Sequence, residues 1–176
     1  MAEGTFLSGE SFGPGHIHDT YRIITAEKGG DDYILQRLNN KVFKDIPRLQ
    51  ENMERVTSHL RSKITAIEGS DIKRECLTLI PSRSSGYSWH ADDEGNFWRM
   101  FIFISDHRSY EQVDSLHKAR EGGRAIGRFQ AMLADLPGEP LHETIPDFHD
   151  IRKRLDTFHR VIEKDPAGRV SGTGIE

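Results

Sequence analysis

The fold is decided by the stretch Phe12-Gly13-Pro14-Gly15-His16-Ile17-His18-Asp19-Thr20-Tyr21, which is followed by the apolar run Tyr33-Ile34-Leu35-Gln36-Arg37-Leu38-Asn39. Glycine permits positive φ and lets a ligand approach the backbone closely. The pattern predicts a β-hairpin whose glycine-rich tip presents backbone N–H groups to an anion, next to a strand that carries a cation. A Gly-x-Gly segment between two strands is also compatible with an ordinary turn.

Composition bounds the class of protein. The chain has 176 residues, 35% hydrophobic and 30% charged, which is enough for one domain with a real core. Its net charge of −4 argues against a nucleic-acid binder. The single cysteine, Cys76, excludes an internal disulfide and a cysteine-based zinc site, and we expect it to be buried. No basic leader and no membrane-length apolar run is visible, so we expect a cytoplasmic protein without membrane contact.

A helix is predicted to begin at Asp45, because aspartate is a good N-cap and Pro47 suits the first turn. Its apolar residues recur every three or four positions, as expected for one buried stripe: Leu49, Met53, Val56, Leu60 and Ile64. We place the end of this helix before Gly69.

Strands are predicted over residues 75–81, 87–90 and 97–104, with an acidic turn Asp92-Asp93-Glu94 before the last of them. The spacing of these acids does not fit an EF-hand loop, so no metal site is expected there. Helices follow over residues 113–136 and from Asp147 or Asp150 to a stop at Asp165-Pro166-Ala167-Gly168. Grouped strands with one inserted helix, then helices, predict an α+β fold with a mostly antiparallel sheet of about five strands and one flanking helix.

The sequence resembles phosphotransferases of the aminoglycoside and choline kinase type, in particular the N-acetylhexosamine 1-kinase branch. The resemblance runs from about Gly13 to Gly168. It rests on the glycine loop and third strand quoted above, and on Val42-Phe43-Lys44-Asp45, Glu51-Asn52-Met53-Glu54-Arg55-Val56, Gly95-Asn96-Phe97-Trp98-Arg99-Met100, Gly127-Arg128-Phe129 and the segment Leu136 to Asp150.

This resemblance implies a protein-kinase-like fold with two lobes. Residues 1–105 would form the nucleotide-binding N-terminal lobe. Residues 106–168 would form the incomplete helical start of the second lobe, and residues 169–176 a polar tail.

The resemblance also implies where ATP binds. The loop over the phosphates would comprise Gly13, Gly15, His16, Ile17, His18 and Asp19. Arg37 is the candidate for the phosphate-binding cation, although Gln36 could face the nucleotide instead. Either Glu51 or Glu54 would orient that cation from the helix, or both would simply be solvated. The hinge that meets adenine would comprise Phe103, Ile104 and Ser105.

Relatives of this type carry a His-Gly-Asp catalytic loop and an acidic metal-binding motif, and neither occurs in this sequence. Phosphoryl transfer needs these groups to position the acceptor and to hold Mg²⁺. We therefore expect an N-terminal fragment of a sugar kinase, with no catalytic or metal-binding residue of its own, able to bind nucleotide and inactive alone. A sugar would bind only with the second lobe supplied.

Two other functions fit the sequence. A pseudokinase-like binding or interaction module would bind nucleotide without turnover. A histidine-based metal enzyme could use His16, His18 and Asp19, since residues i and i+2 of a strand share a face. In addition, the apolar stripes of the last two helices predict self-association.

Overall fold

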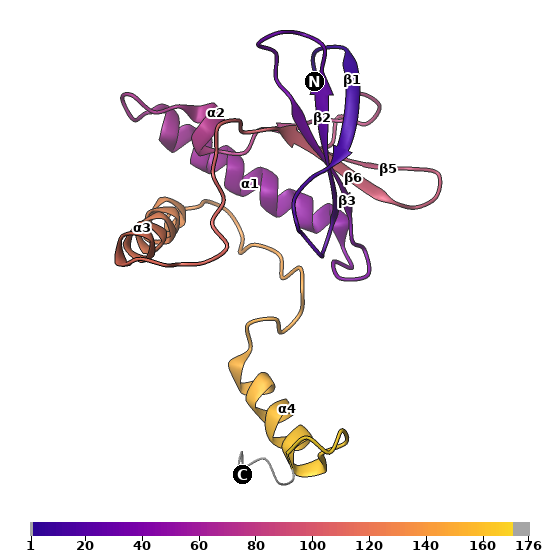
Figure 1. Cartoon of the computed structure of the whole chain (residues 1–176), viewed down its shortest axis with the longest axis vertical. Coiled ribbons are helices and arrows are strands. Elements are labelled where there is room, and N and C mark those ends of the chain that lie inside the picture. Colours follow the sequence, from indigo (N-terminus) through magenta and orange to yellow (C-terminus); the bar gives the residue numbers. More distant parts are fainter. Residues whose placement is uncertain (1, 171–176) are drawn as a thin grey trace. The chain divides into compact units, whose positions relative to one another are not determined.

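The computed structural model describes residues 2–170. Within them the fold is α+β, with a six-stranded antiparallel sheet and four helices (Figure 1). The strands are β1 (Phe6–Ser11), β2 (Asp19–Thr25), β3 (Tyr33–Leu38), β4 (Leu79–Ile80), β5 (Trp89–Ala91) and β6 (Phe97–Ile102). The helices are α1 (Ile46–Thr65), α2 (Ile72–Glu75), α3 (Leu116–Leu133) and α4 (Ile151–Lys164).

The sheet has the order β1-β2-β3-β6-β4, and β5 pairs with β6 beside β4. Residues paired across antiparallel strands share a face of the sheet. Thr20, Gln36 and Arg99 are paired in this way on the face toward α1, which we call the helix face. The opposite face carries the neighbouring set Asp19, Arg37 and Trp98. The register therefore places Gln36, and not Arg37, toward the helix.

Helix α1 begins as the sequence predicts. The Asp45 carboxylate accepts a hydrogen bond from the Arg48 N–H at 3.0 Å, and Pro47 occupies the first turn. Ile46 and Gln50 of this helix are the largest side chains with less than 2% exposure among the described residues. The N-terminal half of α1 is therefore held firmly against the sheet.

A second part of the core lies at the other end of α1. Leu60, Ile64 and Cys76 are buried together, and partly buried apolar residues of α1, α2 and α3 pack on them, namely Val56, Ile72, Met132 and Leu133. The expected burial of Cys76 is confirmed, with 4% exposure, and burial raises the pKa of its thiol.

The end of α3 and the segment after it are held to α1 by hydrogen bonds. Side chains of α1 bond the backbone carbonyl groups of residues 132–142. Asn52, Arg55, His59 and Lys63 are three or four residues apart and so form one stripe on the helix. Their partners include the carbonyl groups of Met132, Pro137, Glu139 and His142. This polar stripe thus anchors residues 132–142.

Two elements differ from the sequence-based predictions. The first residues of the strand expected over 75–81 belong to α2 and its cap, and only Leu79–Ile80 remain as a strand. The cause is local: the Asp71 carboxylate accepts from Lys73 N–H at 3.1 Å, and Glu75 accepts from Asp71 N–H at 3.0 Å, which stabilises a helical turn. The sheet has six strands, where about five were expected.

The chain divides into two compact units, Met1–Thr144 and Ile145–Glu176. The lobe boundary expected after Ser105 stays a prediction. The second unit contains α4, capped by Asp150, whose carboxylate accepts from Lys153 N–H at 2.9 Å. Its apolar residues Ile151 and Phe158 are 79% and 56% exposed. The self-association expected from this stripe stays a prediction. No helix within residues 2–170 combines the length and apolar character needed to cross a membrane.

The acidic turn between β5 and β6 is organised by Asp92. Its carboxylate accepts four hydrogen bonds, from the Trp98 indole at 2.8 Å, the Asn96 N–H and side-chain amide, and the Glu94 N–H. These bonds, the indole bond first, lower the pKa of Asp92 to about 2. Asp92 therefore closes the turn by accepting hydrogen bonds in its charged form.

We expect Asp92→Asn to destabilise the chain at neutral pH and progressively less in acid. The folded pKa lies below the ordinary aspartate value of about 3.9, so the contribution is present above about pH 4 and is lost as the pH falls toward 2. Urea unfolding of both proteins between pH 2 and pH 7 measures the difference. Asp93, one residue along the same turn, accepts no hydrogen bond among the described residues, so Asp93→Asn is the matched control and should destabilise less at pH 7. A difference that is constant with pH would contradict this role.

Candidate functional site

The loop between β1 and β2 presents free backbone donors. The last bond of the hairpin ladder joins Phe12 N–H to the Thr20 carbonyl at 2.9 Å, and Gly13 then takes a φ of 77°, which favours glycine. From Gly15 to His18 no backbone N–H donates a hydrogen bond to any residue between 2 and 170. The glycine loop can therefore accept an anion without giving up bonds of its own.

His18 fixes the base of this loop. Its Nδ1 accepts a hydrogen bond from Asn39 N–H at 3.1 Å, and its ring packs against Phe43 with the ring centres 5.4 Å apart. Burial, and next the charge of Arg99, lower the pKa of His18, against the opposing effect of Asp19. The imidazole is therefore neutral near pH 7, with its proton on Nε2.

Arg37, the predicted phosphate-binding cation, forms an ion pair with Asp19 on the face of the sheet that points away from α1. Its Nη2 lies 2.5 Å from Asp19 Oδ2, and both side chains are about half exposed. Together with His16 and Ile17 these two residues line a polar pocket of about 350 Å³. The structure thus brings four predicted site residues together, around an arginine that already has a carboxylate partner.

Neither candidate glutamate orients Arg37. Glu51 accepts from His142 Nε2 at 2.9 Å, and Glu54 accepts from Ser88 N–H at 3.3 Å. Both lie on α1, and the register of β3 turns Arg37 away from that helix. The ion pair expected between the third strand and the helix is therefore not formed.

Arg99 of β6, to which the sequence assigns no role, is a cation on the helix face. Its Nε donates to Gln36 Oε1 at 2.9 Å, and its Nη1 donates to Gln50 Oε1 at 3.2 Å and lies 2.6 Å from Met53 Sδ. Gln36 in turn donates to the Thr20 hydroxyl at 2.9 Å. Burial lowers the pKa of Arg99 to about 10, so the guanidinium is still charged at neutral pH.

The predicted hinge follows β6 and is partly engaged by neighbouring side chains. Phe103 N–H donates to the Asp32 carbonyl at 2.8 Å, and His107 bonds the carbonyl of Ile104 at 2.6 Å. Arg74 donates to the carbonyl of Ser105 at 2.8 Å. Each carbonyl keeps a second lone pair, and the N–H groups of Ile104 and Ser105 make no hydrogen bond in the part of the chain that is described. Free donors therefore remain for a ligand.

Aromatic rings connect the hinge to the start of the glycine loop. The rings of Phe12 and Phe103 lie 5.4 Å apart in an edge-to-face arrangement, and the His107 ring packs against both. The Arg22 guanidinium lies 4.3 Å from the centre of the Phe103 ring. Two segments that the sequence assigns to one site, the loop and the hinge, are therefore neighbours in the fold.

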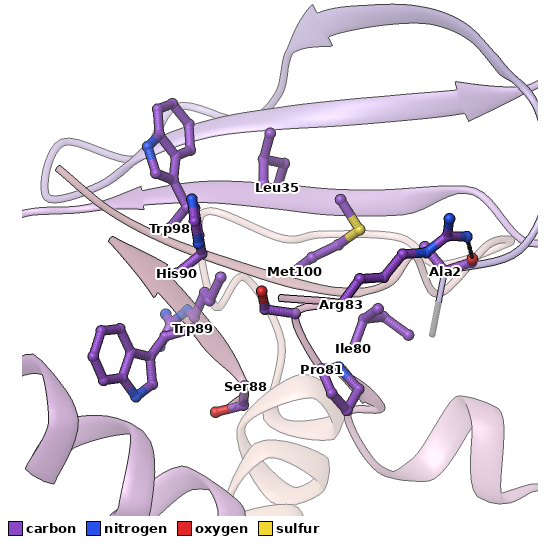
Figure 2. Close-up of a pocket in the computed structure, with 12 residues that line it drawn as sticks. Ala2, Leu35, Ile80, Pro81, Arg83, Ser88, Trp89, His90, Trp98 and Met100 are labelled. Carbon is purple, nitrogen blue, oxygen red and sulfur yellow. Dashed lines mark hydrogen bonds between the residues drawn. The ribbon is translucent and has the colours of Figure 1, made fainter. Parts of the chain in front are cut away.

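Sequence reasoning also missed an apolar pocket of about 370 Å³ next to β6 (Figure 2). Alternating residues of β3 and β6 supply Leu35, Trp98 and Met100, and the β4 end supplies Ile80 and Pro81. The available signal was that these strands carry apolar residues at successive positions and so present apolar side chains on both faces. Polar side chains line it as well, among them Arg83, His90 and Arg99, although most of the surface that it exposes is apolar.

Metal-binding chemistry has no geometric support. Within residues 2–170 no group of three or more His, Cys, Asp or Glu side chains could hold a metal ion. The His16, His18 and Asp19 set is divided, since His18 bonds Asn39 and Asp19 pairs with Arg37.

A comparison of the sequence with models of known protein families finds no match.

Proposed function

We propose that residues 1–105 form a nucleotide-binding lobe related to those of small-molecule kinases, and that the chain binds ATP or ADP without transferring phosphate. The observation that carries the proposal is the glycine loop: four consecutive residues with free N–H groups join two antiparallel strands, and the second of these strands is connected through Gln36 to the partly buried Arg99. Free N–H groups in a loop of this kind bind phosphate oxygens. Kinases cover the phosphates of ATP with a glycine-rich loop.

The order of the elements supports the same proposal. Three strands, the helices α1 and α2, and three more strands precede the hinge. Apart from the short α2, this is the order of strands and one inserted helix that the kinase resemblance implies. The donors suit ATP: the loop offers N–H groups to phosphates, and the hinge offers N–H groups and aromatic rings to a base. Mg²⁺ would accompany ATP in complete relatives, where acidic groups hold it. The 176 residues contain no His-Gly-Asp sequence to position an acceptor hydroxyl.

The parent reaction in such relatives would be phosphorylation of a small sugar, an N-acetylhexosamine in the branch that the sequence resembles. Holding ATP equally well before and during the reaction does not lower its barrier. Acceleration requires alignment of the acceptor and neutralisation of charge around the transferred group. The proposed activity of this chain is therefore nucleotide binding, as in a pseudokinase-like module.

Calorimetry with millimolar ATP, ADP and adenosine tests the proposal. We expect ATP and ADP to bind and adenosine to bind more weakly. Gly15→Pro should weaken ATP binding by about 10-fold or more, because it removes an N–H that bonds a charged phosphate. Gly15→Ala keeps the N–H, and its Cβ would meet no atom within 4 Å, so it should bind as wild type does.

Absence of any ATP binding by the folded wild-type chain would contradict the proposal. The second half of the proposal is that the chain does not transfer phosphate. An assay of radiolabelled phosphate transfer from ATP to N-acetylglucosamine or N-acetylgalactosamine with Mg²⁺ tests it. We expect no transfer above a control without protein, and transfer that Gly15→Pro abolishes would overturn it.

A further inference from the structure

We propose that Arg99, and not Arg37, is the cation that binds the phosphates of the nucleotide. This inference rests on the proposed function and assigns its charged contact to a residue of β6. It is carried by the hydrogen-bond partners of the guanidinium, by the face of the sheet on which it lies and by its place next to the glycine loop.

The partners of Arg99 leave its charge uncompensated. Gln36, Gln50 and Met53 are all neutral, and no carboxylate within residues 2–170 lies within ion-pair distance of it. Arg22, the neighbouring arginine on the helix face, shows the contrast, because it has an ion pair with Asp32 at 2.7 Å. A largely buried charge is normally paired. Arg99 is thus the cation of this face that lacks an anion.

The same contacts hold the guanidinium in one orientation. Each glutamine turns its Oε1 toward Arg99, because the Gln36 amide nitrogen donates to Thr20 and the Gln50 amide nitrogen donates to the Ser88 carbonyl at 3.1 Å. The remaining nitrogen, Nη2, makes no hydrogen bond among the described residues. The buried side-chain atoms that lack a hydrogen bond in this part of the chain are Arg22 Nε and Ser88 Oγ. Arg99 Nη2 is not among them, so it is not fully buried. The arginine is therefore positioned with one free, accessible donor.

The charge of Arg99 acts electrostatically on the base of the glycine loop. Arg99 lowers the pKa of His18, which forms the base of the loop, and Thr20 at the start of β2 is joined to Arg99 through Gln36. A phosphate group under the loop could accept from its N–H groups and from Arg99 together. Arg37 lies on the opposite face and is neutralised by Asp19.

The role resembles that of the lysine in protein kinases, which projects from the third strand toward a helix. Here the corresponding position on β3 is Gln36, whose amide cannot supply a charge. The adjacent strand supplies the guanidinium instead, and Gln36 orients it. Of its three nitrogens only Nη2 is without a hydrogen bond among the described residues, so the phosphate contact would be made by the two N–H groups of Nη2.

The test measures binding of ATP, tripolyphosphate and adenosine to wild type, Arg99→Lys, Arg99→Gln and Arg37→Gln. We expect Arg99→Gln to weaken ATP and tripolyphosphate about 10- to 100-fold, Arg99→Lys to weaken them less, and Arg37→Gln to leave them unchanged. Circular dichroism checks the fold of each variant. Should Arg99→Gln not fold, the NMR resonance of the wild-type Arg99 Nε–H must still shift on addition of tripolyphosphate.

The outcomes separate the two proposals. ATP binding that is indifferent to Arg99→Gln, or lost in Arg37→Gln, overturns the assignment of Arg99 and leaves nucleotide binding standing. A third outcome is that tripolyphosphate binding depends on Arg99, while ATP and tripolyphosphate bind with equal affinity and adenosine does not bind. This outcome supports the anion site and contradicts a nucleotide site. Failure of wild type to bind either anion, with no shift of the Arg99 resonance, overturns both.

Discussion

Replacing Ile64 by alanine is expected to destabilise the folded chain by about 2–5 kcal/mol, the range for an isoleucine truncated in a well-packed core. Ile64 is 3% exposed and lies with Leu60 and Cys76 where α1, α2 and α3 meet. Truncation removes apolar side-chain surface that packs among residues of all three helices. Urea or thermal unfolding followed by circular dichroism measures the loss.

A matched control for this substitution lies on α3. Ile126 is 63% exposed, so Ile126→Ala removes little buried surface and replaces isoleucine with a better helix former. We expect it to change stability by less than about 0.5 kcal/mol. Equal losses in the two variants would mean that the contact between α1 and α3 is not part of the cooperative core.

The elements with strong local signals were predicted well from the sequence. Asp45 and Pro47 mark the start of α1, and a stripe with helical spacing runs from Leu49 to Ile64, so its start and face could be given in advance. The apolar runs of β3 and β6 were equally clear. In each case the residues that favour the element lie within one short stretch of sequence.

The four residues of α2 show a local signal that the strand pattern concealed. Apolar and β-branched residues near Leu79 favour a strand, but Asp71 and Glu75 stabilise one turn of helix just before it. Capping residues spaced in this way were visible in the sequence. They give a better prediction here than the apolar content of residues 75–81.

The charged part of the candidate site could not be predicted, for a different reason. Which face of a strand a residue occupies depends on register, and a shift of one residue exchanges Gln36 and Arg37. Register is set by pairing with β2 and β6, far along the chain. The partners of Arg99 lie 63 and 49 residues away at Gln36 and Gln50, so its environment has no local signature.

Gln50→Leu is expected to be the second large destabilisation, although it keeps the volume of the side chain nearly constant. Gln50 is 0% exposed, accepts from Arg99 and donates to the Ser88 carbonyl. Leucine can do neither, so it leaves a buried acceptor and part of a buried charge without partners. Each such loss costs about 1–3 kcal/mol, more than the apolar side chain gains.

Urea unfolding of Gln50→Leu measures this loss, and Gln130→Leu on the exposed surface of α3 is the matched control, expected within about 0.5 kcal/mol of wild type. Since Gln50 also orients Arg99, the variant should bind tripolyphosphate more weakly than wild type under conditions where both are folded. A Gln50→Leu protein as stable as wild type would show that water satisfies Arg99 and Ser88 without the amide. The orientation of Arg99 would then have to come from Gln36 and Met53 alone.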